Sequence, residues 1–420
     1  MLDIKYIRDN QEAVVAALSK RMDKKNIGLK ELLGLDDSRR NLIKEVEALK
    51  AERNQSSKTK PSPETIAAMK TVGEQIKALE EDLNKLKDEI QDKISALPNL
   101  PADDVVAGGK ENNEVIYTYG EKPNQKFETK DHVALAESLG VIDYVRAAKM
   151  SGAGFWCYRG MGALLEWALI SYFIAYHNKN GYQFLIPPFL LSEKSAYTSG
   201  HLPKFRDELF WTQDKLCLNA TSEMMLGNYH REEILPTERL PLKYFAYSPC
   251  FRREAGSYRQ EERGMVRGHQ FNKVEMFIFC KAEDSWAMFD ELVENAKGLV
   301  EGLGLHYQVS KLAAGDCSAA MAKTYDLEIW LPSMGIYKEV SSISNALDYQ
   351  ARRGQTRYKN ESGENVFVHT LNASGLATSR LLPAILEQNQ QEDGSVRIPD
   401  ALRPFIPGAP EFIYPDNNKI

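Results

Sequence analysis

Hydrophobic residues in the first hundred positions recur at the alternating three- and four-residue spacings of a heptad seam. One series contains Leu35, Leu42, Val46 and Leu49, and a second contains Met69, Val72, Ile76, Leu79, Leu83, Leu86, Ile90 and Leu97. Such spacing predicts two long amphipathic helices that pack along a shared seam. The polar, breaker-rich segment 54–63 between them predicts a turn. We therefore expect an antiparallel helical hairpin over about 28–97, with its turn at about 54–63.

Local signals set the ends of these helices. Ser62 followed by Pro63 suits an N-cap and a proline in the first turn, and Pro98 and Pro101 end the second helix. Each arm of roughly 30 residues would be about 45 Å long. A hairpin of this kind has too little core to form a catalytic unit by itself. It serves either as a probe for a partner or as a dimerisation coiled coil.

Basic residues gather near the predicted turn although the chain is acidic overall. Residues 38–60 hold seven basic and three acidic side chains, in a chain whose formal net charge is −6. A basic tip on an acidic body allows contact with an extended anion, such as an RNA arm, at one place only. We therefore favour RNA binding over dimerisation for the hairpin. The candidate RNA-binding residues are Arg39, Arg40, Lys44, Lys50, Arg53 and Lys58.

The chain changes character after the hairpin. Residues 101–120 read as a linker, and aromatic, proline-containing and β-branched runs follow. The patterns predict helices at 161–177 and 285–302 and strands at 184–186, 244–247, 273–280, 325–330 and 366–369. Because the strands do not alternate regularly with helices, the fold class is α+β, with a mostly antiparallel sheet flanked by helices. We expect a helical arm over 1–105 and a larger domain over 106–420.

The composition excludes a membrane or disulfide-rich protein. No apolar run approaches the ~20 residues needed to cross a bilayer, and the N-terminus lacks the layout of a secretory signal. The five cysteines lie far apart, without a C-x-x-C pair. We therefore expect reduced thiols and a cytoplasmic protein with no membrane partner. The cysteines are Cys157, Cys217, Cys250, Cys280 and Cys317.

Arginine and glutamate are dense around a predicted strand–loop–strand at 251–275, whereas glycine-rich phosphate-binding signatures are missing from the sequence. Arg252 and Glu254 are two positions apart, so on a strand they would share one face. Arg267, Phe271 and Glu275 follow at spacings of four and would also share a face. A cation for phosphate, an aromatic ring for a base and an acid for an ammonium form a plausible nucleotide and amino-acid site. The alternative is a salt-bridged surface hairpin.

Two further segments favour the binding site over the surface hairpin. Thr221, Ser222 and Glu223 form a short polar cluster, and the small residues of 371–379 precede Arg380, which opens an apolar helix. Small residues let a ligand approach the backbone, and a helix N-terminus favours phosphate.

Together these segments resemble class II aminoacyl-tRNA synthetases, and specifically the bacterial-type seryl-tRNA synthetase family. Segment 181–189 resembles the first class II motif, which forms a dimer interface. Phe251, Arg252 and Glu254 with Arg267 and Phe271 resemble the second motif, and 373–380 resembles the third. The hairpin resembles that family's tRNA-reading arm. The strings that point to serine are TSE, PCFRREAGSY, HQFNKVEMF, KTYDLEIW, KEVSSISNALDYQARR and VHTLNASGLA.

The resemblance implies a homodimeric ligase with a class II catalytic domain. The implied reaction has two steps: the carboxylate of L-serine attacks the α-phosphate of ATP, and the seryl group then passes to the 3′ end of tRNA(Ser). The family leads us to expect tRNA(Sec) as a second acceptor where that tRNA exists. Charge neutralisation and alignment carry such chemistry, with Mg²⁺ as the metal.

The resemblance also assigns catalytic and nucleotide-binding roles. Arg252 would bridge the α-phosphate and the substrate carboxylate, and Arg380 would hold the γ-phosphate. Glu254 would bind the adenine amino group and Phe271 would stack on the ring, while Glu339 and Ser342 would bind Mg²⁺. Loop 255–266, with Arg259 and Arg263, would adjust between ATP and the tRNA end. The full implied ATP-binding set is Arg252, Arg253, Glu254, Gly268, Phe271, Glu339, Val340, Ser341, Ser342 and Arg380.

The implied serine pocket lies beside the nucleotide site. Glu275, the third implied catalytic residue, and Glu223 would take the ammonium and hydroxyl of serine between them. Asn345 and Asn372 are second choices for the pocket. The implied serine-binding residues are Thr221, Ser222, Glu223, Arg252, Glu275, Asn372 and Ser374.

The sequence departs from the family pattern at three places. Ala373 and Ser379 stand where glycine is frequent, which is a mild change. Gly268 replaces a bulkier apolar residue, which predicts a looser nucleotide pocket. Segment 317–322 lacks a frequent Gly-Phe pair, which leaves the substrate wall open to question.

Two rival functions remain open from the residues. A related ligase could pass the aminoacyl group to a non-tRNA acceptor such as a carrier protein, although such relatives often lack or shorten the helical arm, which this chain keeps. A non-catalytic RNA-binding paralogue should have lost Arg252, Glu275 or Arg380, and this chain has all three.

Overall fold

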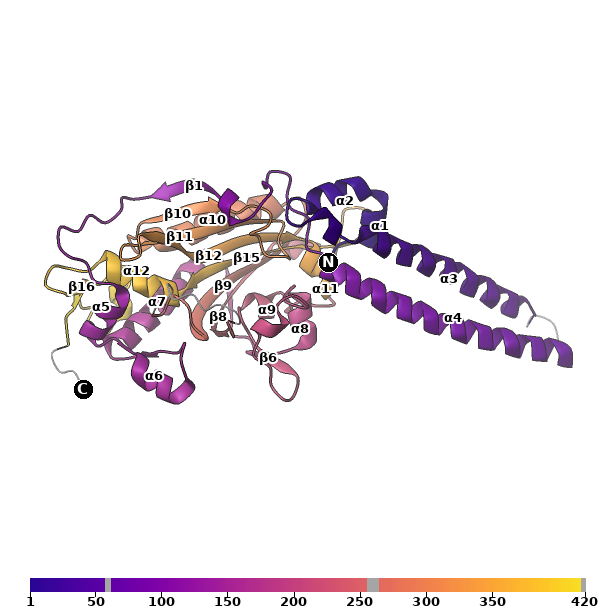
Figure 1. The fold of residues 1–420 in the computed structure, drawn as a ribbon, viewed down its shortest axis with the longest axis horizontal. Coiled ribbons are helices and arrows are strands. Elements are labelled where there is room, and N and C mark those ends of the chain that lie inside the picture. The colour runs from indigo at the N-terminus through magenta and orange to yellow at the C-terminus, as the bar shows by residue number, and fades with distance from the viewer. Residues whose placement is uncertain (57–61, 255–263, 417–420) are drawn as a thin grey trace. The chain divides into compact units, whose positions relative to one another are not determined.

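The structure is a computed structural model that describes residues 1–56, 62–254 and 264–416. The chain divides into two compact units, 1–100 and 101–420, each with its own internal contacts. Figure 1 traces both along the chain. The unit boundary falls at Pro101, where the heptad pattern stops.

The first unit is helical. A buried Asp36 accepts hydrogen bonds from Arg8 at 2.7 Å and from Arg39 at 2.6 Å, which ties α3 to α1. Because both arginines neutralise this carboxylate, its burial is compensated. The helices are α1 (Ile4–Asp9), α2 (Gln11–Leu18), η1 (Lys24–Asn26), α3 (Leu29–Ser56) and α4 (Pro63–Ala96).

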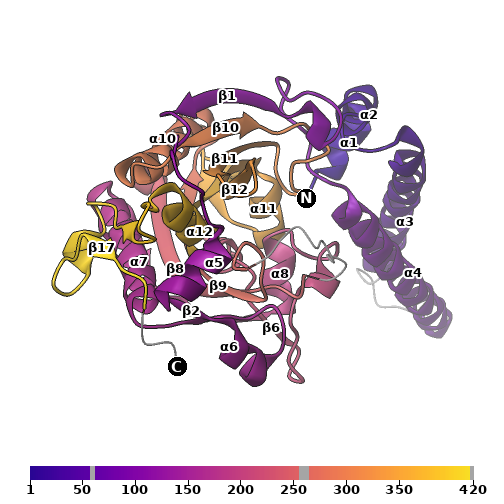
Figure 2. The same cartoon turned by 60° about the vertical axis from the view of Figure 1, so that its left-hand side comes forward.

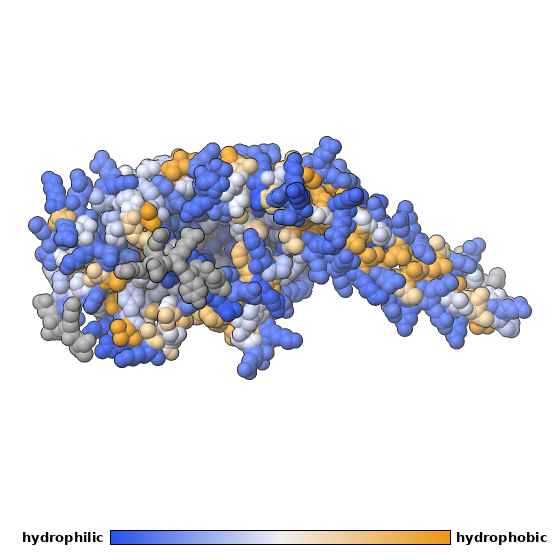
Figure 3. Space-filling view, in the orientation of Figure 1, coloured by the Kyte–Doolittle hydropathy of each residue, from blue (hydrophilic) through white to orange (hydrophobic). Residues whose placement is uncertain are grey.

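Helices α3 and α4 form the predicted antiparallel hairpin. They have 28 and 34 residues, hence about 42 and 51 Å at 1.5 Å per residue. Ser62 caps α4 by accepting a hydrogen bond from the Thr65 amide, with Pro63 in the first turn, as predicted. Val46, Ile76 and Leu83 are buried along the seam. Figure 3 shows hydrophobic residues between the two helices and hydrophilic ones outside.

The second unit is built on an eight-stranded sheet in the order β1-β10-β11-β12-β15-β9-β8-β4. Every neighbouring pair is antiparallel except β4 with β8, which confirms the mostly antiparallel sheet. Figure 2 shows its strands side by side. The strands are β1 (Glu114–Tyr119), β4 (Gln183–Leu185), β8 (Leu242–Phe251), β9 (Gln270–Cys280), β10 (Tyr307–Lys311), β11 (Lys323–Leu331), β12 (Ile336–Leu347) and β15 (His369–Ala377).

Smaller elements surround this sheet. The helices are η2 (Lys110–Asn112), α5 (His132–Leu139), α6 (Tyr144–Ser151), α7 (Met161–Lys179), α8 (Glu193–Thr198), η3 (Arg206–Glu208), α9 (Glu223–Leu226), η4 (Thr237–Arg239), α10 (Ser285–Gly302), α11 (Tyr349–Gly354), α12 (Thr378–Gln388) and η5 (Arg403–Phe405). The short strands are β2 (Ile142–Asp143), β3 (Cys157–Tyr158), β5 (Leu190–Ser192), β6 (Leu216–Leu218), β7 (Ile234–Leu235), β13 (Arg357–Lys359), β14 (Asn365–Phe367), β16 (Val396–Arg397) and β17 (Phe412–Ile413).

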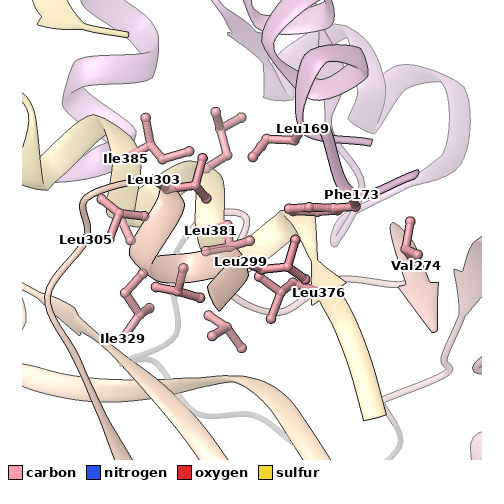
Figure 4. Close-up of a cluster of buried hydrophobic side chains, with 14 of the residues drawn as sticks. Leu169, Phe173, Val274, Leu299, Leu303, Leu305, Ile329, Leu376, Leu381 and Ile385 are labelled. Carbon is pink, nitrogen blue, oxygen red and sulfur yellow. The ribbon is translucent and has the colours of Figure 1, made fainter. Parts of the chain in front are cut away.

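One face of the large sheet packs against α7, α10 and α12 to form the main core. Val274 on β9, Ile329 on β11, Phe173 on α7 and Leu299 on α10 belong to one buried hydrophobic cluster (Figure 4). Because side chains alternate along a strand, the strand residues next to Val274 and Ile329 point to the opposite face of the sheet. That opposite face holds the polar cavity described below.

The structure corrects part of the predicted strand pattern. Helix 285–302 is confirmed to the residue, and helix 161–177 continues to Lys179. The strand predicted at 366–369 is wrong as a unit, because β14 ends at Phe367 and β15 begins at His369. Strand β15 contains the small residues expected to precede α12. Within the described residues, no helix is long and apolar enough to cross a membrane.

Candidate active site

A cavity of about 450 Å³ opens on the face of the sheet that α7, α10 and α12 leave uncovered. A smaller adjoining cavity shares six lining residues with it: Arg252, Glu254, Arg267, Lys273, Glu339 and Ser374. The first also contains Thr221, Glu223, Glu275, Ser342 and Asn372; the second also contains Gly268, Phe271, Val340 and Arg380. Most of the predicted amino-acid and nucleotide residues therefore line two connected cavities.

Strand alternation explains most of this arrangement. On β9, Phe271 and Glu275 face the cavity. Val274 and Met276, on either side of Glu275 in the sequence, point into the core. Ser374 on β15 pairs directly with Glu275. The spacing-of-four prediction for Phe271 and Glu275 is therefore right, although Arg267 precedes β9 and reaches the cavity from the loop.

Glu339 and Ser342 are three positions apart and would point to opposite faces of a regular strand. A register shift between β11 and β12 pairs Leu327 with Ser341 and Glu328 with Glu339, so one extra residue is accommodated at Val340. Such a β-bulge resets the alternation. Both Glu339 and Ser342 consequently line the cavity.

Arg252 and Glu254 also both line the cavity, but not because they share one face of a strand, as predicted. Strand β8 ends at Phe251, and Glu254 has a φ of 51°, in the left-handed region. The two residues therefore leave the strand before its alternation can align them. Glu254 instead accepts a hydrogen bond from Arg267 Nε at 2.6 Å, while Arg252 lies over the Phe271 ring, 5.2 Å from its centroid.

The end of the cavity that holds the predicted serine-binding residues is a buried network of charged and hydroxyl groups. Glu275 Oε2 lies 2.6 Å from Lys273 Nζ, and Glu275 Oε1 accepts a hydrogen bond from Asn372 at 3.1 Å. Glu223 accepts a hydrogen bond from Gln350 at 2.7 Å. Burial, followed by the nearby Glu275 carboxylate, raises the pKa of Glu223 to about 7. A cationic ligand group would relieve this unfavourable pairing of acids.

The end of the cavity that holds the predicted nucleotide-binding residues is arranged around Arg380, in the first turn of α12. Its Nη1 donates to the Glu339 carbonyl at 2.7 Å and lies 3.4 Å from the Glu339 carboxylate. The guanidinium therefore faces the cavity beside the helix N-terminus, where an anion is favoured. Phe271 contributes an aromatic face to the same part of the site.

Several predicted residues have side chains that point elsewhere. The Ser222 hydroxyl is buried and lies 2.7 Å from that of Ser248, and the Ser341 hydroxyl donates to the Ser374 carbonyl. Arg253 is exposed and does not line the cavity. Asn345 donates to Ser285 on α10 at 2.8 Å, because its position in β12 places it on the core face. Asn345 is thus excluded as a side-chain ligand.

Gly268, which stands where the family has a bulkier apolar residue, does not loosen the pocket as predicted. A Cβ built on Gly268 would lie 2.1 Å from Trp156 Cζ3 and 2.8 Å from the Gly154 carbonyl. The Trp156 ring therefore occupies the place of a larger side chain at this position, so the pocket is not loosened there.

Replacing Gly268 with leucine should lower the free energy of unfolding by about 1–3 kcal/mol through overpacking. In the double variant with Trp156→Ala, the loss of unfolding free energy should be at least about 1 kcal/mol smaller than the sum of the losses in the two single variants. Urea unfolding measures both effects. Gly34→Leu is the control, because a Cβ there meets nothing within 4 Å. Additive losses in the double variant would contradict the assignment of Trp156 to this space.

Sequence reasoning missed one wall of the cavity and one central residue, and it pointed to a second wall only through a departure from the family pattern. Residues His201, Phe205, Glu208 and Leu209 form one wall, and Ser318, Ala320 and Met321 form another. The second wall is the segment that lacks the Gly-Phe pair, so that departure does fall on the cavity. Lys273 was also missed, although its position two residues before Glu275 could have placed it on the same face.

The basic residues predicted to bind RNA differ in their surroundings. Arg39 and Arg40 pair with Asp36 and Asp37, and Lys50 pairs with Glu80 at 2.6 Å. Lys44 and Arg53 are exposed on α3. Lys58 lies outside the described residues, as do Arg259 and Arg263 and most of their loop.

The family models match both units of the chain. Residues 204–389 match the tRNA synthetase class II core domain (G, H, P, S and T), and residues 1–101 match the seryl-tRNA synthetase N-terminal domain. Serine–tRNA ligase 2 of Clostridium acetobutylicum is 52% identical over 97% of this chain and 99% of that protein. Serine–tRNA ligase of Geobacter sulfurreducens is 44% identical over 97% of this chain and 99% of its own length.

Solved structures agree with these matches. The seryl-tRNA synthetase of Pyrococcus horikoshii in complex with ATP has a TM-score of 0.93 at 34% identity, covering 99% of this chain and 100% of that one. A prolyl-tRNA synthetase of Giardia lamblia, with a TM-score of 0.58 and 18% identity over 66% of this chain and 57% of that one, shares the fold alone. The predicted resemblance and fold class are confirmed, and the chain belongs to the seryl-tRNA synthetase family of class II synthetases.

Proposed function

We propose that this protein is a serine–tRNA ligase. It activates L-serine with ATP to form seryl-adenylate and pyrophosphate, and transfers the seryl group to the 3′ end of tRNA(Ser), and of tRNA(Sec) where that tRNA exists. The observation that carries the proposal is the pair of connected cavities. Arg252 lines both of them, one cavity contains the acidic residues Glu223 and Glu275, and the other contains Phe271 and Arg380. A family relative with ATP bound supports the nucleotide as substrate.

Each end of the cavity suits one substrate. Phe271 offers a ring for adenine to stack on, Glu254 an acceptor for its amino group, and Arg380 a cation for the γ-phosphate. Glu223 and Glu275 take the ammonium and hydroxyl of serine between them. The carboxylate and α-phosphate then meet at Arg252, whose planar donors suit two neighbouring anionic groups.

The site needs alignment and charge neutralisation more than proton transfer. Serine's carboxylate oxygen attacks the α-phosphorus, and the bond to pyrophosphate breaks. Arg252 faces the charge that develops at the α-phosphate, so a group preorganised in the cavity stabilises the transition state. In the second step the ribose hydroxyl of tRNA attacks the seryl carbonyl, and AMP leaves.

The donor set on β12 fits Mg²⁺. Glu339 and Ser342 both present hard oxygen atoms to the cavity, as this ion prefers. Asp326, paired with Ser342 across the strands, has a buried Oδ1 with no hydrogen-bond partner, so further oxygen capacity lies nearby. A cluster of three or more acidic, histidine or cysteine ligands is not found among the described residues. Bound there, Mg²⁺ would neutralise phosphate charge.

Replacing Glu339 with glutamine should raise the Mg²⁺ concentration for half-maximal ATP–pyrophosphate exchange about tenfold, because one anionic oxygen is lost. Titrating Mg²⁺ at fixed ATP measures this shift. Glu328→Gln is the matched control, since Glu328 pairs with Glu339 across β11 and β12 and accepts hydrogen bonds from Gln308 and Ser310. An unchanged midpoint in Glu339→Gln would contradict the assignment.

The remaining parts of the proposal concern partners. The hairpin contacts the tRNA through the basic side of α3, the chain acts as a homodimer through 181–189, and the protein works in the cytoplasm.

Pyrophosphate exchange across the twenty amino acids, followed by tRNA charging with the best one, tests the function. Serine should give the strongest exchange and tRNA(Ser) should be charged. Exchange without tRNA charging would favour a carrier-protein acceptor, and neither activity would favour a non-catalytic RNA-binding protein.

A further inference from the structure

Lys273 is a buried cation at the centre of the site that the roles above leave unused. It projects from β9, is 5% exposed, and lines both parts of the cavity. A buried lysine is uncommon unless its ammonium is paired. Its surroundings therefore indicate what it does.

The ammonium reaches acceptors on three separate segments of the chain. Its Nζ lies 2.6 Å from Glu275 Oε2, donates to Thr221 Oγ1 at 2.6 Å, and lies 3.4 Å from Ser374 Oγ. An ammonium has three donors and no acceptor. Two of these contacts are hydrogen bonds and the third is an ion pair with Glu275, so we expect Lys273 to act on a ligand through these neighbours.

The contact with Thr221 determines the direction of its hydroxyl. Thr221 Oγ1 accepts from Lys273 and also from the Glu223 amide at 3.3 Å. A hydroxyl has two acceptor positions and one donor. With both acceptor positions used, Thr221 can only donate to a ligand in the cavity. Ser374, which also accepts from Lys273, is biased in the same direction.

The contact with Glu275 determines the role of that carboxylate. Glu275 is 1% exposed, and an unpaired carboxylate there would carry a large desolvation penalty. Lys273 offsets its charge, and Asn372 occupies its other oxygen at 3.1 Å. The partner of Glu223 is the neutral amide of Gln350. Glu223 is therefore the less compensated acid and suits an ammonium, whereas Glu275 suits a hydroxyl.

We propose that Lys273 is a specificity-determining positioning residue, which fixes the donor and acceptor pattern that distinguishes serine from amino acids lacking its hydroxyl. A site built to hydrogen-bond a substrate hydroxyl can reject an analogue without it by about 10⁴-fold or more. That rejection depends on fixed partners, and Lys273 holds three of them. The inference rests on the proposed function of the site.

Replacing Lys273 with methionine tests it in full-length protein by exchange kinetics. The KM for serine should rise about 100-fold, and the ratio of kcat/KM for serine to that for alanine should fall at least about 100-fold. The KM for ATP should change less than about threefold. Lys243→Met is the matched control, because Lys243 on β8 pairs with Glu291 at 2.5 Å outside the cavity.

Restoring the ammonium keeps the test informative if methionine disturbs folding. Lys273→Cys should show the same defects, and 2-bromoethylamine should convert that thiol into a lysine analogue and recover at least a third of the serine-to-alanine ratio. Wild-type protein treated in the same way controls for reaction at Cys157, the only natural cysteine in the described residues that is not buried. Recovery of exchange without recovery of the ratio would overturn the proposal.

The outcomes separate this inference from the proposed function. An unchanged serine-to-alanine ratio in Lys273→Met, beside a wild-type protein that activates serine, overturns the role of Lys273 only. A wild-type protein that activates no serine overturns the proposed function instead.

Discussion

Replacing Arg252 with alanine should lower serine-dependent ATP–pyrophosphate exchange by about 10³-fold, which corresponds to about 4 kcal/mol of transition-state stabilisation. Arg252 lines both parts of the cavity and is held by a hydrogen bond from its Nε to the Ala220 carbonyl at 3.3 Å and by the Phe271 ring. These contacts aim its remaining donors at the junction where the substrate carboxylate and the α-phosphate would meet. Initial rates of exchange at saturating serine and ATP measure the loss.

The neighbouring Arg253 provides a matched comparison. It has the same charge and is adjacent in sequence, but it is exposed and its side chain lies outside the cavity. Arg253→Ala should retain exchange within about threefold. Arg252→Lys should lower the rate of exchange by at least about tenfold, because an ammonium lacks the fixed planar donors with which a guanidinium binds two neighbouring anions. Equal losses at Arg252 and Arg253 would show that net charge, rather than placement, determines the rate.

Arg380→Ala should also abolish exchange, for a different reason. Arg380 lies in the first turn of α12 and contacts Glu339, so its loss removes the cation proposed to bind the γ-phosphate and releases the carboxylate proposed to bind Mg²⁺. The KM for ATP should therefore rise, whereas binding of AMP, which has no γ-phosphate, should change little. A similar loss of AMP affinity would place Arg380 elsewhere in the nucleotide site.

The parts of the fold that sequence predicted well are those set by local periodicity. The α3–α4 seam and helix α10 repeat their hydrophobic residues over many turns, and Ser62 with Pro63 marks a helix start by side-chain and backbone chemistry alone. The resemblance to a known family then identified residues in both of the connected cavities. Thr221, Glu223, Glu275, Ser374 and Arg380 do line the connected cavities.

Three of the misses share a physical cause, because each depends on contacts between distant segments. The bulge at Val340, which turns Glu339 toward Ser342, is visible only in the pairing of β12 with β11. Glu254 reaches the cavity by a left-handed backbone turn and a pair with Arg267 rather than by strand alternation. Trp156 fills the space beside Gly268 from more than one hundred positions upstream. No local pattern encodes such neighbours.

Deleting residues 30–95 and joining the ends through a short glycine–serine linker should leave pyrophosphate exchange within about threefold of wild type and reduce tRNA charging at least about 10³-fold. Every residue of the connected cavities lies between positions 199 and 380, in the second compact unit. The ends to be joined begin α3 and end α4, which run antiparallel as packed neighbours about 8–10 Å apart. Exchange and charging assays on one preparation measure both effects, and normal charging would refute the arm's role.

A point variant separates loss of RNA contact from loss of structure. Lys44 and Arg53 are exposed on α3, whereas Arg39 holds the buried Asp36. Lys44→Ala with Arg53→Ala should weaken tRNA binding and reduce the slope of log affinity against log salt by about two, because each phosphate contact contributes about one. Lys24→Ala with Lys25→Ala removes the same charge from η1 outside the hairpin and should leave the slope unchanged. If both pairs change it equally, tRNA affinity depends on overall charge, and α3 has no specific part in choosing the RNA.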